Sequence, residues 1–338
     1  MDRVSRPLLA RAGEQRVLSE IAMAAALDLS GLRPDKAEWR QFGIRAMRFA
    51  AILSLAAGMV FLVAFNWQNL GLYARFAIVE ASLLAALIAA WIEGTDQLSG
   101  KLALMLAVMM TGALLALFGQ TYQTGANVYE LFAGWAALAL PWVIACRYAP
   151  CWALWLLLVN AAVALYAGTV GHGLFFSLFM DRWRWTPWSL PFLLDVLLYA
   201  ALAALSRWEG LGLSERWLRR GVMAAAMAFG TIVMAFRIFD FGERSNDSGA
   251  TAIEAMLFLL ASAGFGTYAY SRKEDLFGVA VLALAWIIVT ATLLGHAMAS
   301  AGIVMLFIVA IYVIGVSTAA VKGISYLGRT WKDGEAAQ

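Results

Sequence analysis

Apolar runs long enough to cross a membrane recur along the whole 338-residue chain, and they constrain its fold more than any other feature. A helix needs about 20 apolar residues to cross a hydrocarbon layer of about 30 Å. Backbone groups in lipid can be satisfied only within helices or closed barrels, and these runs are too long for barrel strands. With 14% charged residues and a mean hydropathy of +0.76, the chain is expected to be an all-α, polytopic integral membrane bundle.

The runs predict about ten transmembrane helices. These lie near residues 45–65, 72–92, 101–119, 128–146, 149–168, 190–206, 218–239, 249–270, 275–294 and 299–321. Of the 25 Lys and Arg residues, 20 fall on one side of this arrangement, and the other side has Arg75, Arg182, Arg184, Arg237 and Arg244. Because positive residues beside short loops are retained in the cytoplasm, both termini are predicted to be cytoplasmic.

Five segments follow from this pattern. Residues 1–44 are expected to be a cytoplasmic amphipathic helical segment, either a docked hairpin or a surface for a partner or anionic headgroups. Residues 45–168 form the predicted first transmembrane bundle and residues 190–321 the second. Between them, the Trp-rich residues 169–189 are expected to lie at the outer interface, as an anchor or as a lid over substrate. Residues 322–338 are the predicted cytoplasmic tail.

Recognisable catalytic, cofactor and metal motifs are missing from the sequence. It has no Walker-type phosphate loop or nucleophile elbow, and His172 and His296 are too far apart to suggest a metal site. We therefore predict no catalytic residue, no cofactor and no metal. The net charge of +3 reflects the cytoplasmic bias, so no nucleic acid partner is expected. Cys146 and Cys151 flank a short cytoplasmic turn, where a packing role is expected.

Ionisable residues inside the spans carry the functional hypothesis, because they are costly in lipid and usually face protein or water. Four acids lie in the outer halves of predicted spans, namely Glu80, Glu130, Asp195 and Glu254. Their shared sidedness predicts an outward-opening polar cavity, with Arg237 at the end of the seventh span. The alternative is structural: these side chains reach the headgroups, or form interhelical pairs such as Arg237 with Glu254 or Asp240.

A polar stretch of unusual composition, "LFGQTYQTGANVYELFAGW", occupies residues 117–135 between two apolar runs. Its uncharged hydrogen-bonding side chains include Gln120, Tyr122, Gln123 and Asn127. They either satisfy helix ends in a packed outer turn or form the rim of the cavity. Gly119 and Gly125 would permit positive φ in that turn. The candidate binding set therefore combines these four residues with the four acids and Arg237.

The motifs "AAGMVFLVAFNWQNL" and "LFGQTYQTGANVYELFAGWAALALPW" resemble a family of bacterial predicted membrane proteins, domain of unknown function 2157. The likeness covers roughly residues 12–165. It implies a multi-pass protein of the bacterial inner (cytoplasmic) membrane, and the family has no assigned activity to carry over.

Two function classes remain. The first is a transporter of a small or amphiphilic solute, using the outward-facing cavity. The second is a non-transporting scaffold or sensor subunit that partners other envelope proteins. An integral membrane enzyme ranks third. The expected surroundings are the lipid bilayer, with a membrane protein partner or a homo-oligomer as open alternatives.

Overall fold

The structure is a computed structural model, and it describes residues 19–29, 35–123, 125–169, 186–206, 211–240, 248–271 and 275–335. All regular structure in these ranges is helical, which confirms the all-α prediction. The first half contains α2 (Glu20–Leu29), α3 (Lys36–Phe65), α4 (Leu72–Glu93), α5 (Leu98–Tyr122), α6 (Val128–Cys146) and α7 (Ala149–Thr169). The second contains α9 (Ser189–Leu205), α10 (Arg216–Asp240), α11 (Ser248–Ser271), α12 (Leu276–Ala297), the 3₁₀ turn η3 (Ala299–Ala301) and α13 (Ile303–Glu335).

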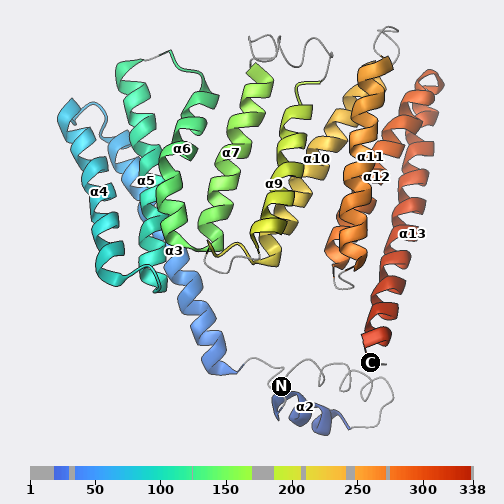
Figure 1. The fold of residues 1–338 in the computed structure, drawn as a ribbon, viewed down its shortest axis with the longest axis horizontal. Coiled ribbons are helices and arrows are strands. Elements are labelled where there is room, and N and C mark those ends of the chain that lie inside the picture. Colours follow the sequence, from blue (N-terminus) through green and yellow to red (C-terminus); the bar gives the residue numbers. More distant parts are fainter. Residues whose placement is uncertain are drawn as a thin grey trace.

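Ten of these helices form a row of upright rods (Figure 1). Within the described ranges, nine are long and apolar enough to cross a membrane, and α9 is a shorter apolar helix. Each of the ten predicted spans coincides with one of these ten helices. The chain is therefore a multi-pass membrane protein.

The first and last spans extend beyond the predicted boundaries. Because α3 begins at Lys36, the last part of the expected cytoplasmic segment 1–44 and the first span are one continuous helix. Asp35 is its N-cap: Asp35 Oδ1 accepts from the Glu38 amide at 2.6 Å, and Glu38 Oε2 accepts from the Asp35 amide at 3.2 Å. Likewise α13 continues to Glu335, so the predicted tail is helical from residue 322 to that point.

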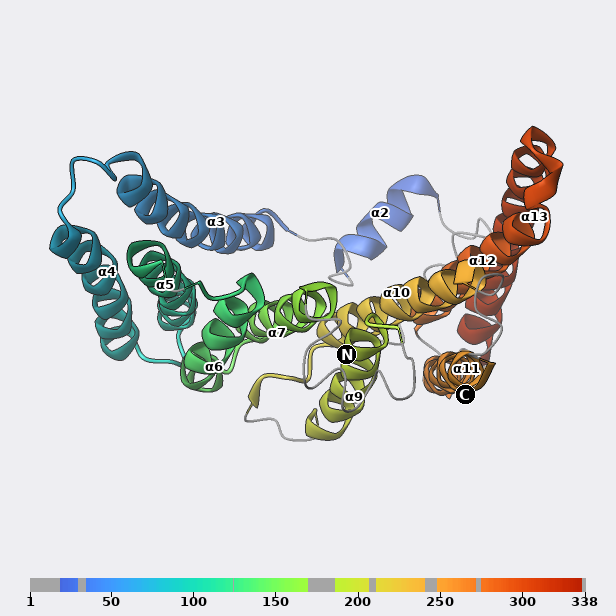
Figure 2. The same ribbon diagram turned by 90° about the horizontal axis from the view of Figure 1, so that it is seen from above.

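The helices follow an open arc when seen from above, with α4 at one end and α13 at the other (Figure 2). In the first half α5 is central, packing against α3, α4 and α6, and in the second half α12 packs against α10, α11 and α13. The contact between α7 and α9 joins the halves. In α5, 61% of the spanning window is buried within the chain, whereas none of the α13 window is.

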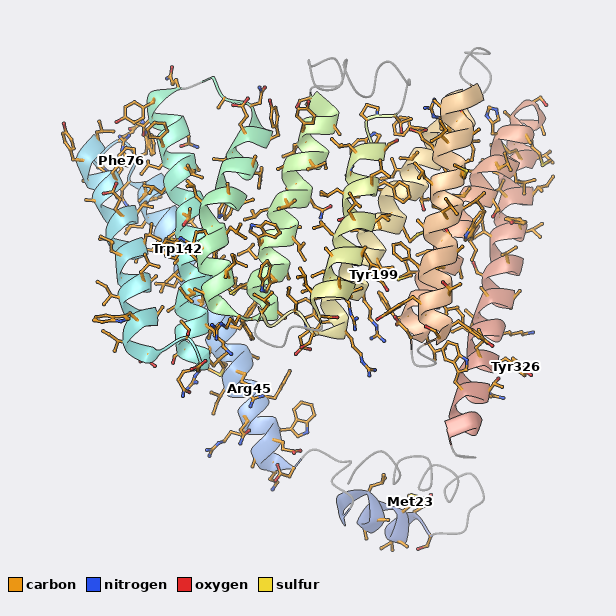
Figure 3. The ribbon with its side chains drawn as sticks, in the orientation of Figure 1. Met23, Arg45, Phe76, Trp142, Tyr199 and Tyr326 are labelled. Carbon is orange, nitrogen blue, oxygen red and sulfur yellow. The ribbon has the colours of Figure 1, made fainter. Side chains whose placement is uncertain are left out.

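Side chains project from the arc on all sides (Figure 3). Many large exposed ones are apolar, such as Phe61, Trp91 and Phe307, as expected for helices that face lipid. Arg45 on α3 and Tyr326 on α13 both lie toward the end where these two helices project beyond the row (Figure 3). The first and the last spanning helix thus extend on the same side, which agrees with an even number of crossings.

Candidate functional site

Arg237 and Glu254 form a buried ion pair in the second half of the chain. Arg237 lies in the last turn of α10 and Glu254 lies in the second turn of α11. Arg237 Nε donates to Glu254 Oε2, and the two side chains are 7% and 1% exposed. This is one of the two interhelical pairs that the sequence suggested as the structural alternative.

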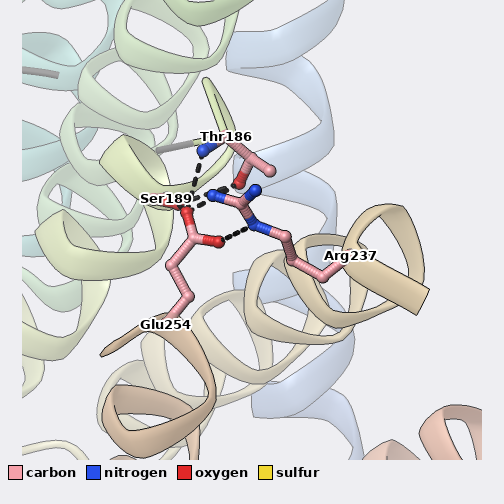
Figure 4. Close-up of polar contacts among 4 residues, drawn as sticks. All are labelled: Thr186, Ser189, Arg237 and Glu254. Carbon is pink, nitrogen blue, oxygen red and sulfur yellow. Dashed lines mark hydrogen bonds and ion pairs between the residues drawn. The ribbon is translucent and has the colours of Figure 1, made fainter. Parts of the chain in front are cut away.

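The second carboxylate oxygen of Glu254 is held by the start of α9 (Figure 4). Glu254 Oε1 accepts from the Thr186 amide at 2.8 Å, from Thr186 Oγ1 at 3.2 Å and from Ser189 Oγ. Burying a carboxylate is costly unless it is paired and hydrogen-bonded, and here both oxygens have donors. The cluster therefore joins the N-terminal ends of α9 and α11 to the C-terminal end of α10.

Asp195 lies in very different surroundings, although it is also fully buried. It is six residues beyond Ser189 on α9, about 9 Å along the helix at 1.5 Å per residue. Asn160 of α7 donates from Nδ2 to Asp195 Oδ1 at 2.9 Å and to the Leu156 carbonyl at 3.1 Å. Among the described residues, Asp195 Oδ2 and Asn160 Oδ1 have no hydrogen-bond partner. The pair thus holds two buried acceptors that lack a donor.

Asn160 was not among the residues that the sequence singled out. It is a lone amide in the apolar run "LLLVNAAVAL" of α7, and that isolation is the signal that could have found it. Thr186 and Ser189 carried no comparable signal, because hydroxyl side chains are common near helix starts. Their role depends on α11 passing beside them.

Glu80 lies apart from these groups, on α4 in the first half. Its side chain is exposed, and it makes no hydrogen bond or ion pair in the part of the chain that the structure describes. The buried residues of α4 are Val79, Ala86 and Ala90. The structure therefore does not bring Glu80 together with Asp195 or Glu254.

The polar stretch between α5 and α6 is partly helical, because α5 continues through Tyr122. Positive φ angles occur at Gln123 (43°) and Gly125 (67°), so the expectation holds for Gly125, whereas Gly119 is an ordinary helical residue. The side chains of Gln120, Tyr122, Gln123, Asn127 and Glu130 are all exposed. Asn127 Nδ2 donates to Glu130 Oε1 at 3.2 Å, and the Tyr122 ring lies 4.7 Å from that of Phe118. Whether this stretch is a cavity rim stays a prediction.

The Asn-Trp motif after the first span organises the turn between α3 and α4. The guanidinium of Arg75 lies 3.8 Å from the centre of the Trp67 ring, and Arg75 Nε donates to the Leu70 carbonyl at 2.9 Å. Asn66 Nδ2 donates to the Leu62 carbonyl at 2.9 Å, which satisfies one end of α3. Arg75, which the charge pattern predicts to lie on the outer side, is therefore engaged in this turn.

Residues 13–152 match the model of a family described as "Predicted membrane protein (DUF2157)". This segment is similar to the DUF2157 family. The match confirms the resemblance that was predicted for roughly residues 12–165. The matched segment runs from before α2 to the first turn of α7, so Asn160, Asp195, Arg237 and Glu254 all lie beyond it. Comparison with curated proteins and with solved structures found no match.

Proposed function

We propose that this protein transports a small or amphiphilic solute across the bacterial inner membrane, and that Asp195 is the residue that exchanges a proton during transport. The observation that carries the proposal is the Asp195–Asn160 pair, a buried carboxyl inside a span with no basic partner among the described residues. Ionisable groups inside membrane helices are costly, and they commonly mark paths for ions, protons or substrates.

The hydrogen-bond donors and acceptors of the Asp195–Asn160 pair explain why this pair favours binding of a proton. An ionised carboxyl only accepts hydrogen bonds, whereas a protonated one also donates. A buried acceptor without a donor costs about 1–3 kcal/mol. A proton on Asp195 Oδ2 supplies a donor where Asp195 Oδ2 and Asn160 Oδ1 now have none. Binding and release of that proton would change the contact between α7 and α9.

The Arg237–Glu254 cluster supports a path to Asp195 from the outer end. Thr186 and Ser189 both donate to Glu254; Ser189 begins α9 six residues before Asp195, and Thr186 lies just before that helix. In the proposal, release of α9 from this cluster opens the path from the outer end to Asp195. Glu80 and the exposed polar stretch with Gln120, Tyr122, Gln123, Asn127 and Glu130 remain the proposed rim on the first half.

The test uses purified protein in liposomes on a solid-supported membrane, which records charge movement on solute addition. The probes are tetraphenylphosphonium, benzoate and alanine, which represent an organic cation, an organic anion and a zwitterion. We expect one class to give a current that depends on an imposed pH gradient and is lost in Asp195→Asn. The control Glu215→Gln alters an exposed acid just before α10 and should keep the current. If folded wild-type protein gives no current with any probe, or Asp195→Asn keeps it, the proposal fails.

A second candidate is a non-transporting scaffold or sensor subunit. It is favoured by the open arc, in which α13 buries no part of its spanning window and α4 exposes a carboxylate. Such surfaces suit protein partners in the membrane. This reading predicts no solute current with any of the three probes and a stable assembly in the same liposomes.

A further inference from the structure

The two cysteines of the chain are in direct contact at the turn between α6 and α7. Cys146 is the last residue of α6, and Cys151 lies in the first turn of α7. Both are free thiols, their Sγ atoms are 2.6 Å apart, and both side chains are fully buried. Cys146 Sγ also donates to the Lys101 carbonyl at 3.4 Å. The fold therefore places two sulfur atoms side by side, where the sequence predicted only packing.

The backbone of this turn holds the cysteines in position. Arg147 ends α6 in the left-handed conformation, with a φ of 48°. The Cys151 amide donates to the Tyr148 carbonyl at 3.0 Å at the start of α7. Pro150 suits this first turn, because its fixed φ matches a helix start. The two thiols thus lie face to face, which is the arrangement that a disulfide requires.

The same turn is part of the contact between the two halves of the chain. Gly212, in the segment before α10, packs so closely on the turn that a Cβ atom at this position would overlap the Arg147 carbonyl. Trp152 of α7 donates from Nε1 to the Leu211 carbonyl at 2.8 Å. A covalent bond across the turn would therefore fix one side of the contact between the halves.

We propose that Cys146 and Cys151 are a reversible redox site, at which hydrogen peroxide converts the two thiols into an intramolecular disulfide. One sulfur, as the thiolate, attacks the O–O bond of the peroxide, which breaks to give a sulfenic acid and hydroxide. The second thiolate then displaces hydroxide from the sulfenic acid and forms the S–S bond. The two thiol protons combine with the two hydroxides, so the products are one disulfide and two water molecules. The sulfur atoms lose two electrons, and the peroxide oxygens gain them.

Burial of the site selects the oxidant. Because neither thiol is exposed, a bulky disulfide such as oxidised glutathione cannot reach a sulfur atom, whereas hydrogen peroxide is small and uncharged. The charge pattern predicts that the turn is cytoplasmic, where thiols are normally reduced and the disulfides that do form are usually transient. The dithiol is therefore the resting form. This proposal is independent of the transport proposal, because it uses no residue of the Asp195 or Glu254 groups.

The first experiment detects the disulfide in wild-type protein in liposomes of defined lipids. After peroxide treatment the protein is unfolded in detergent, and free thiols are blocked with N-ethylmaleimide. Trypsin cleaves after Arg147, between the two cysteines, so a disulfide keeps the two peptides joined until dithiothreitol is added. We expect joined peptides in most of the treated monomer. Two blocked thiols after peroxide treatment, or joined peptides only in a cross-linked dimer, would overturn the proposal.

The second experiment uses Cys146→Ala and Cys151→Ala as matched variants, because each leaves one thiol without its partner. Dimedone, which reacts with sulfenic acids, is added together with the unfolding detergent after peroxide treatment. Both variants should be labelled, because their sulfenic acid has no second sulfur with which to condense. The wild type should be labelled far less. Equal labelling of all three proteins would show that the two sulfur atoms do not react with each other.

The third experiment measures the effect of the disulfide on the fold, through the thermal unfolding midpoint. A covalent link across the turn restricts the unfolded chain, so peroxide should raise the midpoint of the wild type by a few degrees. Dithiothreitol should reverse the rise, and Cys151→Ala should show none. An unchanged or lower midpoint in protein that carries the disulfide would contradict a fixed contact between the halves.

Discussion

Glu254 and Asp195 are both buried acids near the N-terminal ends of their helices, but their partners differ. Glu254 accepts hydrogen bonds from Arg237, Thr186 and Ser189, whereas Asp195 accepts one from Asn160. A group whose hydrogen-bonding capacity is filled contributes to holding helices together. A group with an unused acceptor retains the capacity to bind a proton or another donor. The two residues should therefore respond differently to substitution.

At this scale we predict that Arg237→Ala strongly destabilises the protein, because it leaves the Glu254 carboxylate buried without its counter-ion. Breaking a buried pair from one side typically costs about 3–5 kcal/mol. Ser189→Ala removes the hydroxyl that donates to Glu254 and also hydrogen-bonds with Thr186 Oγ1 at 2.9 Å, and should cost about 1–2 kcal/mol. Thermal unfolding in detergent, followed by tryptophan fluorescence, measures both effects. A midpoint for Arg237→Ala equal to that of the wild type would show that the pair contributes nothing to stability.

Asp195→Asn should behave in the opposite way with respect to stability. The amide can donate a hydrogen bond, so it supplies the donor that the Asp195–Asn160 pair lacks. We expect its unfolding midpoint to be equal to or above that of the wild type, while proton-dependent activity is lost. A large fall in the midpoint, comparable with that of Arg237→Ala, would indicate that the ionised carboxylate is the stabilising form.

At the scale of elements, the contact between α5 and α6 depends on Gly112. A Cβ atom at this position would lie 2.3 Å from the ring of Trp135, far closer than side chains pack. The same tryptophan donates from Nε1 to the Val108 carbonyl on α5 at 2.7 Å. The absence of a side chain at Gly112 therefore lets the indole ring lie against the helix and reach that carbonyl.

We predict that Gly112→Ala destabilises the protein by about 1–3 kcal/mol, because overpacking displaces Trp135 and strains its hydrogen bond. Gly119→Ala is the matched control on the same helix, since a Cβ there would meet no atom within 4 Å. Alanine favours helix over glycine by about 1 kcal/mol, so the control should be neutral or slightly stabilising. The unfolding midpoints of the two variants are compared in detergent. Equal changes of the midpoint in Gly112→Ala and Gly119→Ala would contradict the packing argument.

At the scale of the whole molecule, the positive-inside bias predicts which side of the membrane each loop faces. Gln123→Cys, in the turn after α5, should be labelled in intact cells by a membrane-impermeant thiol reagent. Ser214→Cys, in the segment before α10, should be labelled only after the cells are opened. Both positions are exposed, so access depends on sidedness, and the native cysteines are buried. The reverse labelling pattern would show that the orientation is opposite to the predicted one.

The number of spanning helices and the DUF2157 likeness could be predicted from the sequence, because span length and apolar composition are local properties. The ends of the helices could be predicted less well from the sequence. The extension of α3 back to Lys36 depends on the capping box at Asp35, and the extension of α13 continues through polar residues. These features follow helical propensity and capping rather than hydropathy, so a search for apolar runs stops short of them.

The partners of each polar residue were decided only by the tertiary structure. In water a helix shows its buried side as an apolar stripe, but in lipid both the core side and the outer side are apolar. Ala81 and Ala86 are the same residue five positions apart on α4, yet one is exposed and the other is buried against α5. The sequence by itself therefore determined that the acids lie within membrane helices. The rotation of each helix about its axis, set by packing against its neighbours, decided that Glu254 meets Arg237, that Asp195 meets Asn160 and that Glu80 faces outward.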